Sequence, residues 1–165
     1  MLHAPILENA PRRDWRWANE ADTQAFAQQL AATAGLRDAF IELHGDLGAG
    51  KTTFVRHLLR ALGISGRVKS PTYAVVEPHE TPDGLAISHF DFYRFNDPQE
   101  WEDAGFRDLF AAPGLKLAEW PEKAAGLLPL ADWVLHIRPG DDDARHVTVH
   151  APTALGARLL QDMPL

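Results

Sequence analysis

Cysteine is absent from this 165-residue chain, which excludes a disulfide framework and a thiolate metal site. No apolar run reaches the length that spans a membrane. Residues 1–13 also lack the long apolar segment of a secretory signal peptide, so we expect a cytoplasmic protein without membrane association. The length fits one domain that can bury a core of its own.

Positive charge is scarce as well. Lysine and arginine number 16 against 23 aspartates and glutamates, which gives a net charge of −7 and an isoelectric point near 5.5. Proteins that bind nucleic acid directly usually have a basic patch, whereas the arginines here are scattered. We therefore expect no strong direct binding to nucleic acid. A function in RNA chemistry would depend on protein partners.

The most specific motif is residues 45–52, G-D-L-G-A-G-K-T, which match the phosphate-loop pattern G-x-x-x-x-G-K-[ST]. The apolar run 39–43 predicts a buried strand before it, and apolar residues at helical spacing over 54–62 predict a helix after it. Glycines allow successive N–H groups to surround phosphate oxygens, and the helix start adds more. Lys51 would reach the β- and γ-phosphates, and Thr52 would bind Mg²⁺. An ordinary glycine turn is the alternative, which the flanking strand and helix disfavour.

The remaining pattern predicts one mixed α/β domain over residues 15–165, preceded by a flexible tail over residues 1–14. The predicted strands are residues 15–17, 39–43, 73–77, 85–90, 115–120, 133–138 and 146–150. The predicted helices are residues 20–34, 54–62, 98–104, 106–111, 122–128 and 153–162.

Two acidic residues lie at the ends of predicted strands. Asp91 follows the strand 85–90, and Glu119 lies near the end of the strand 115–120. Because ligands of a doubly wound sheet bind beyond the carboxyl ends of its strands, both are candidate site residues. Asp91 would hold Mg²⁺ directly or through water, and Glu119 would supply a second oxygen or orient a water. Alternatively, each caps a turn or pairs with an arginine. No glutamate follows Asp91, so an attacking water has no obvious base.

Other segments have two interpretations or a structural one. The hydroxyl-rich segment Ser70-Pro71-Thr72 is either a switch that responds to the γ-phosphate or a simple entry into the next strand. The start of the helix 20–34, from Glu20 to Thr23, either flanks an adenine or is scaffold. The eight histidines are dispersed without the spacing of metal ligands, so we predict no zinc site. Those on predicted strands are His136, His146 and His150.

Four segments together resemble a known family. Residues 45–53, 68–73 (V-K-S-P-T-Y), 89–94 (H-F-D-F-Y-R) and 119–121 (E-W-P) occur in this order. The combination resembles the bacterial TsaE family, and the resemblance covers approximately residues 17–149. The phosphate loop alone is generic, whereas the other three segments together are specific.

The resemblance implies a P-loop NTPase-like fold, with a mixed, largely parallel central sheet flanked by helices. It implies a cytoplasmic, Mg²⁺-dependent ATPase required for threonylcarbamoyladenosine modification of tRNA. The protein would bind TsaD and TsaB, hydrolyse ATP to support turnover of that complex, and meet tRNA only through it. Lys51, Asp91 and Glu119 would act in hydrolysis, and Thr52, Asp91 and Glu119 would bind Mg²⁺. The implied nucleotide contacts are Glu20, Thr23, Asp46, Leu47, Gly48, Ala49, Gly50, Lys51, Thr52, Thr53, Thr72 and Arg145.

Two other classes of protein share the phosphate loop. A small-molecule kinase typically has an arginine-rich lid over the phosphates, and no segment here groups several arginines in that way. A nucleotide-dependent binding switch would use hydrolysis only incidentally. For the ATPase, the missing adjacent base and the lack of an evident internal arginine finger predict slow hydrolysis alone and faster hydrolysis with partners.

Overall fold

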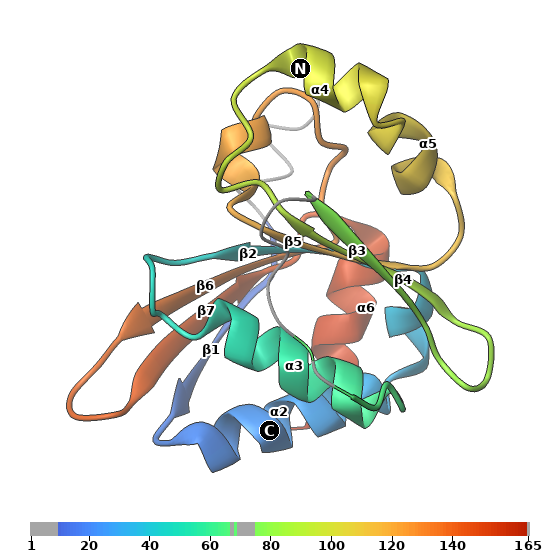
Figure 1. Cartoon of the computed structure of the whole chain (residues 1–165). Helices are drawn as coiled ribbons and strands as arrows, with labels where there is room; N and C mark the ends of the chain where they lie inside the picture. Colours follow the sequence, from blue (N-terminus) through green and yellow to red (C-terminus); the bar gives the residue numbers. More distant parts are fainter. Residues whose placement is uncertain (1–9, 67, 69–74, 165) are drawn as a thin grey trace.

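The computed structural model describes residues 10–66, 68 and 75–164. In this part of the chain, seven strands form one sheet in the order β1-β7-β6-β2-β5-β4-β3 (Figure 1). The strands are β1 (Arg12–Trp17), β2 (Phe40–His44), β3 (Val76–Glu80), β4 (Ala86–Asp91), β5 (Leu115–Glu119), β6 (Trp133–Pro139) and β7 (Arg145–His150). The neighbours β6, β2, β5 and β4 are parallel, and the remaining pairings are antiparallel. The mixed sheet is confirmed, and parallel pairing is limited to its four central strands.

Helices cover both faces of this sheet. The helices α2 (Glu20–Ala31), α3 (Lys51–Ala61) and α6 (Ala154–Asp162) lie on one face, and α4 (Pro98–Asp103) and α5 (Phe106–Ala111) lie on the other (Figure 1). Two short 3-10 turns are η1 (Ala34–Asp38) and η2 (Pro121–Ala124). Within the described ranges, no helix is long and apolar enough to cross a membrane.

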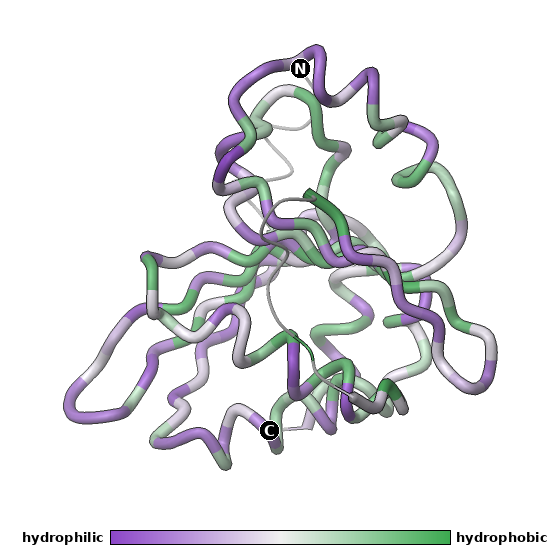
Figure 2. The backbone as a smooth tube through the Cα atoms, viewed as in Figure 1, coloured by the Kyte–Doolittle hydropathy of each residue, from purple (hydrophilic) through white to green (hydrophobic). Residues whose placement is uncertain are grey.

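The central strand β2 is buried from both sides, which explains its hydrophobic sequence. Ile41 and Leu43 point into the core shared with α2 and α3, whereas Phe40 points into a second core beneath α4 and α5. On α3, the predicted apolar residues Phe54, Val55, Leu58 and Leu59 are all at 0% exposure, whereas Leu62 follows the helix and is partly buried. In Figure 2 the hairpin between β6 and β7 is mostly hydrophilic. The sheet therefore fixes β2 and α3 firmly on either side of the glycine loop.

Several boundaries predicted from the sequence are wrong. The helix predicted over 20–34 ends at Ala31, and the strand predicted to end at residue 77 continues to Glu80. The strand β1 begins at Arg12 and pairs with β7, so residues 12–14, which we assigned to the tail, belong to the sheet. This edge strand alternates exposed and half-buried side chains, which hides it from a search for apolar runs. The predicted helix over 122–128 is only the turn η2, because the backbone leaves helical geometry at Ala125, with φ −55° and ψ 137°, and Gly126 follows with a φ of 86°.

Candidate functional site

The glycine loop joins β2 to α3, as the motif predicted. Gly50 has a φ of 112°, a conformation that residues with a Cβ rarely adopt. At Gly45, a Cβ would lie 2.7 Å from the carbonyl oxygen of Ile137 on the neighbouring strand. The backbone path therefore requires glycine at both ends of the loop. Because α3 begins at Lys51, the free N–H groups of its first turn face the loop.

Lys51 is held inside the loop that precedes it. Its side chain is buried, and Nζ donates to the carbonyl oxygen of Gly45 and, at 3.5 Å, to that of Asp46. Nζ also lies 3.9 Å from the centre of the Trp120 ring, within range of a cation–π contact. Burial lowers the pKa of Lys51 below its ordinary value, and nearby carboxylates, Glu119 foremost, oppose that shift. In this conformation the loop's own carbonyl groups solvate the lysine.

The two candidate carboxylates lie side by side at one edge of the sheet. Asp91 ends β4 and Glu119 ends β5, and the parallel register pairs them directly. Glu119 is 2% exposed, and its Oε1 accepts a 2.9 Å hydrogen bond from the hydroxyl of Thr52. Asp91 also caps the turn after β4, since its Oδ1 accepts from the backbone N–H of Tyr93 at 3.0 Å. Turn capping and a place in the site are thus compatible for Asp91.

The carboxylates and the loop enclose a cleft of about 360 Å³, which we call the loop cleft. Its lining comprises residues 46–53 with Asp91, Tyr93, Glu119, Trp120 and Arg145. A second hollow of about 300 Å³, the side cleft, is lined by Trp17, Asn19, Glu20, Thr23, Ala49, Gly50, Thr53, Asp143 and Arg145. The two clefts share four residues and together contain every predicted contact residue except Thr72. Ser70, Pro71 and Thr72 lie outside the described residues.

Arg145 and Glu20 connect the clefts to the scaffold. Arg145 begins β7, and its Nε donates to the carbonyl oxygen of Ala49 at 2.9 Å, which ties the loop to the β6–β7 hairpin. Glu20 begins α2, and its Oε2 accepts from Nε2 of His57 on α3 at 2.8 Å. Thr23, one turn further along α2, is buried. The start of α2 therefore both supports α3 and lines the side cleft.

Three aromatic or imidazole side chains at the site had no predicted role. His89, fully buried on β4, places Nε2 2.6 Å from Oε2 of Glu119. Trp120 has a φ of 54°, a left-handed conformation that is strained for a bulky residue. Its ring centre lies 5.0 Å from that of Tyr93, which is 42% exposed. The signal for His89 was its position two residues before Asp91, on the same face of the strand.

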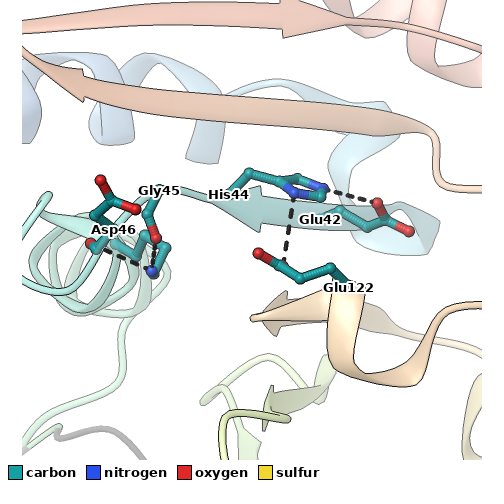
Figure 3. A network of polar contacts seen from close by, with 6 residues as sticks. Glu42, His44, Gly45, Asp46 and Glu122 are labelled. Atoms are coloured by element: carbon teal, nitrogen blue, oxygen red, sulfur yellow. Dashed lines mark hydrogen bonds and ion pairs between the residues drawn. The ribbon is translucent and has the colours of Figure 1, made fainter.

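Three of the histidines that are dispersed in the sequence meet on the other face of the sheet. His44 on β2 stacks on His136 of β6, with ring centres 4.7 Å apart, and His150 packs on its far side. Figure 3 shows His44 between Glu42 and Glu122, next to the start of the glycine loop. Among the described residues, no group of three or more His, Cys, Asp or Glu side chains is arranged to hold a metal ion.

The fold and the loop define a class: mixed α/β proteins in which a glycine loop with the phosphate-loop sequence joins a central parallel strand to a helix. The family described as "Threonylcarbamoyl adenosine biosynthesis protein TsaE" matches residues 17–147 of the chain. This chain belongs to the TsaE family, and the resemblance noted in its motifs is confirmed.

Individual relatives agree with this assignment. The tRNA threonylcarbamoyladenosine biosynthesis protein TsaE of Haemophilus influenzae is 44% identical over 135 residues, covering 82% of this chain and 84% of that protein. The TsaE protein of Bacillus subtilis is 39% identical over 145 residues, covering 87% of each. The crystal structure of Bacillus subtilis YdiB has a TM-score of 0.78 at 30% identity, over 93% of this chain and 95% of that one.

Proposed function

We propose that this protein is a Mg²⁺-dependent ATPase that acts in tRNA threonylcarbamoyladenosine biosynthesis, in the cytoplasm, together with TsaD and TsaB. The family and its named relatives support the pathway. The hydrogen bond between Thr52 and Glu119 is the observation that best supports the chemistry. It joins the start of the motif helix to the carboxyl end of a central strand, where a metal-bound phosphate would lie.

The donor set fits magnesium. Thr52 offers a hydroxyl, and Asp91 and Glu119 offer carboxylates that meet at one edge of the sheet. Mg²⁺ prefers such oxygen ligands and takes the rest of its six from phosphates and water. When bound, it would neutralise charge on the phosphates. These three residues, from α3, β4 and β5, would hold the metal.

The chain's own groups would bind and orient the nucleotide. Backbone N–H groups of residues 46–53 and the start of α3 would surround the phosphates in the loop cleft. Lys51 would exchange its contacts with the carbonyl groups of the loop for phosphate oxygens. Because Arg145 lines both clefts, the nucleoside would extend past it towards Glu20 and Thr23 in the side cleft.

Hydrolysis by the isolated chain should be slow. Of the described residues that line the loop cleft, Asp46, Asp91 and Glu119 have carboxylates. The proposed metal site uses the last two, and Asp46 belongs to the glycine loop. No carboxylate next to Asp91 is therefore left to orient a water. Leu47 and Tyr93 are exposed beside the cleft, at 69% and 42%, and offer apolar surface to a protein. We therefore propose that TsaD and TsaB accelerate hydrolysis, and that tRNA is reached through them.

Phosphate release from Mg-ATP tests the proposal, measured for the protein alone and with TsaD and TsaB. We expect slow release alone, stimulation by the partners, and loss of both in Lys51→Met. Lys116→Met is the matched control, since Lys116 is also buried and donates to carbonyl groups, at the opposite end of β5. ATP binding without a complex or stimulation would instead indicate a small-molecule kinase.

A nucleotide-dependent binding switch predicts a different result. An Asp91→Ala variant that hydrolyses no ATP but still supports tRNA modification in a reconstituted reaction would show that hydrolysis is incidental. We expect that this variant still binds the partners and loses modification activity.

A further inference from the structure

A buried hydrogen-bonded chain of three side chains lies behind the candidate metal site. His89 on β4, Glu119 on β5 and Thr52 on α3 follow one another at 2.6 Å and 2.9 Å. Both His89 and Glu119 are almost fully buried, at 0% and 2% exposure. Each oxygen of the carboxylate thus has one side-chain partner, and the partners come from different elements.

The direction of the hydrogen bond between His89 and Glu119 follows from their chemistry. An ionised carboxylate only accepts hydrogen bonds, so Nε2 of His89 is the donor to Oε2 of Glu119. The second ring nitrogen, Nδ1, is buried and has no hydrogen-bond partner among the described residues.

This arrangement is poor as simple core packing. A leucine at position 89 would fill the core without the unpaired ring nitrogen, but it would leave Oε2 of the buried Glu119 without its donor. The histidine supplies one thing that an apolar residue lacks, a donor aimed at Oε2 of Glu119. With Oε2 fixed, the carboxylate cannot rotate, and Oε1 stays directed at Thr52 and the loop cleft.

We propose that His89 is a positioning residue for binding of the metal–nucleotide complex, an inference that rests on the function proposed above. It orients Glu119 through Nε2 and does not itself contact metal or nucleotide. Partners of metal-binding carboxylates in general tune affinity, and their loss typically weakens metal binding tenfold to a hundredfold.

Two amide substitutions at this position test whether the effect depends on a donor that reaches Glu119 or only on a polar side chain. In His89→Gln the side-chain nitrogen lies about where Nε2 was, whereas in His89→Asn it is one bond shorter and falls short of Glu119. The readout is the Mg²⁺ concentration that half-saturates binding of the ATP analogue AMP-PNP, measured by calorimetry. We expect an increase of about tenfold to a hundredfold in His89→Asn and less than about threefold in His89→Gln. Affinity for AMP-PNP in EDTA should stay the same in both.

Ile87→Ala controls for a merely structural effect. Ile87 is buried in the core on the same face of β4, two residues from His89, and it pairs with Leu115, four residues before Glu119 on β5. Its truncation should lower thermal stability and leave the Mg²⁺ dependence unchanged. If Ile87→Ala raised the Mg²⁺ requirement as much as His89→Asn, positioning by His89 would be refuted. Should His89→Asn not fold, His89→Leu replaces it with the same expectation.

The outcomes distinguish this inference from the proposed function. If the wild-type chain bound AMP-PNP without any Mg²⁺ dependence, the proposed metal site would be wrong and the role of His89 with it. If Mg²⁺ strengthened wild-type binding but His89→Asn behaved like wild type, only the inference on His89 would fail. Nitrogen-15 NMR of the imidazole adds a test without nucleotide, because the absence of a proton on Nε2 would overturn the hydrogen bond on which the inference depends.

Discussion

Replacing Lys51 with methionine should abolish function and yet stabilise the fold. Lys51 is a buried cation at the first residue of the 11-residue helix α3, where the helix dipole disfavours positive charge. Methionine has a similar length and no charge to desolvate. Buried charges can often be replaced by apolar residues without loss of stability, and sometimes with a gain.

Comparison with Lys116 gives the size of the expected difference in stability. It is equally buried, but its Nζ donates to the carbonyl groups of Ala112 and Gly114, just after the last turn of α5, where positive charge is favourable. Helix-end charges contribute about 0.3–1 kcal/mol each. The unfolding free energy of Lys51→Met should therefore exceed that of Lys116→Met by about 0.6–2 kcal/mol, which corresponds to about 1–8 °C in thermal midpoint at this chain length.

Of the two variants, the more stable Lys51→Met should bind nucleotide less tightly. A hydrogen bond to a charged group contributes about 1.5–3 kcal/mol, so losing the lysine should weaken AMP-PNP binding about tenfold to 150-fold. Lys116→Met should bind as wild type does. Calorimetry gives the affinities and thermal denaturation gives the stabilities. A Lys51→Met variant that binds normally, or that is less stable than Lys116→Met, would refute the reasoning.

The gain in stability expected for Lys51→Met depends on pH, and the sign of this dependence can be worked out. Because burial lowers the pKa of folded Lys51, the unfolded chain binds more protons in the alkaline range between that lowered value and the ordinary lysine value. Wild-type stability therefore receives a contribution that rises with pH in this window. Lys51→Met lacks it, so its advantage should be largest at neutral pH and shrink as pH approaches about 10.

Two further predictions concern the scaffold. A Cβ at Gly156 would lie 1.8 Å from the carbonyl oxygen of Asp132, so Gly156→Ala should cost about 1–3 kcal/mol by overpacking, and an unchanged thermal midpoint would contradict this contact. Burial, and next the ring of His44, lower the pKa of His136, so the unfolded chain binds more protons below about pH 6.5. Urea denaturation should show stability falling from pH 7 to pH 5.5, with a smaller fall in His136→Gln. An equal fall in both proteins would exclude His136 as its source.

Much of the site could be predicted because its signals are local. The motif 45–52, the apolar run before it and the helical spacing after it identify a strand, a loop and a helix without any tertiary information. Asp91 and Glu119 were placed together because the carboxyl ends of parallel strands share an edge, and the register confirms that they are neighbours. Their roles in metal binding and hydrolysis remain predictions.

What the sequence did not reveal depends on register between distant segments. Among the described residues, β1 is an edge strand that pairs only with β7, more than a hundred residues later, so its start at Arg12 has no local signal. The stacking of His44 on His136 likewise arises from the pairing of β2 with β6. His89 was a lone histidine in an apolar strand until the alignment of β4 with β5 placed it against Glu119.

The site also stands out by features that work against folding. Lys51 is a buried cation at a helix N-terminus, Glu119 is a buried carboxylate, Trp120 has a left-handed backbone, and one ring nitrogen of His89 has no partner in the described part of the chain. Each feature alone is unfavourable, and the four lie close together: His89 contacts Glu119, Lys51 contacts Trp120, and Glu119 and Trp120 are adjacent in the chain. Strain and buried charge gather where function, and not packing, determines the residue. The energetics therefore point to the same cluster as the motif does, on independent grounds.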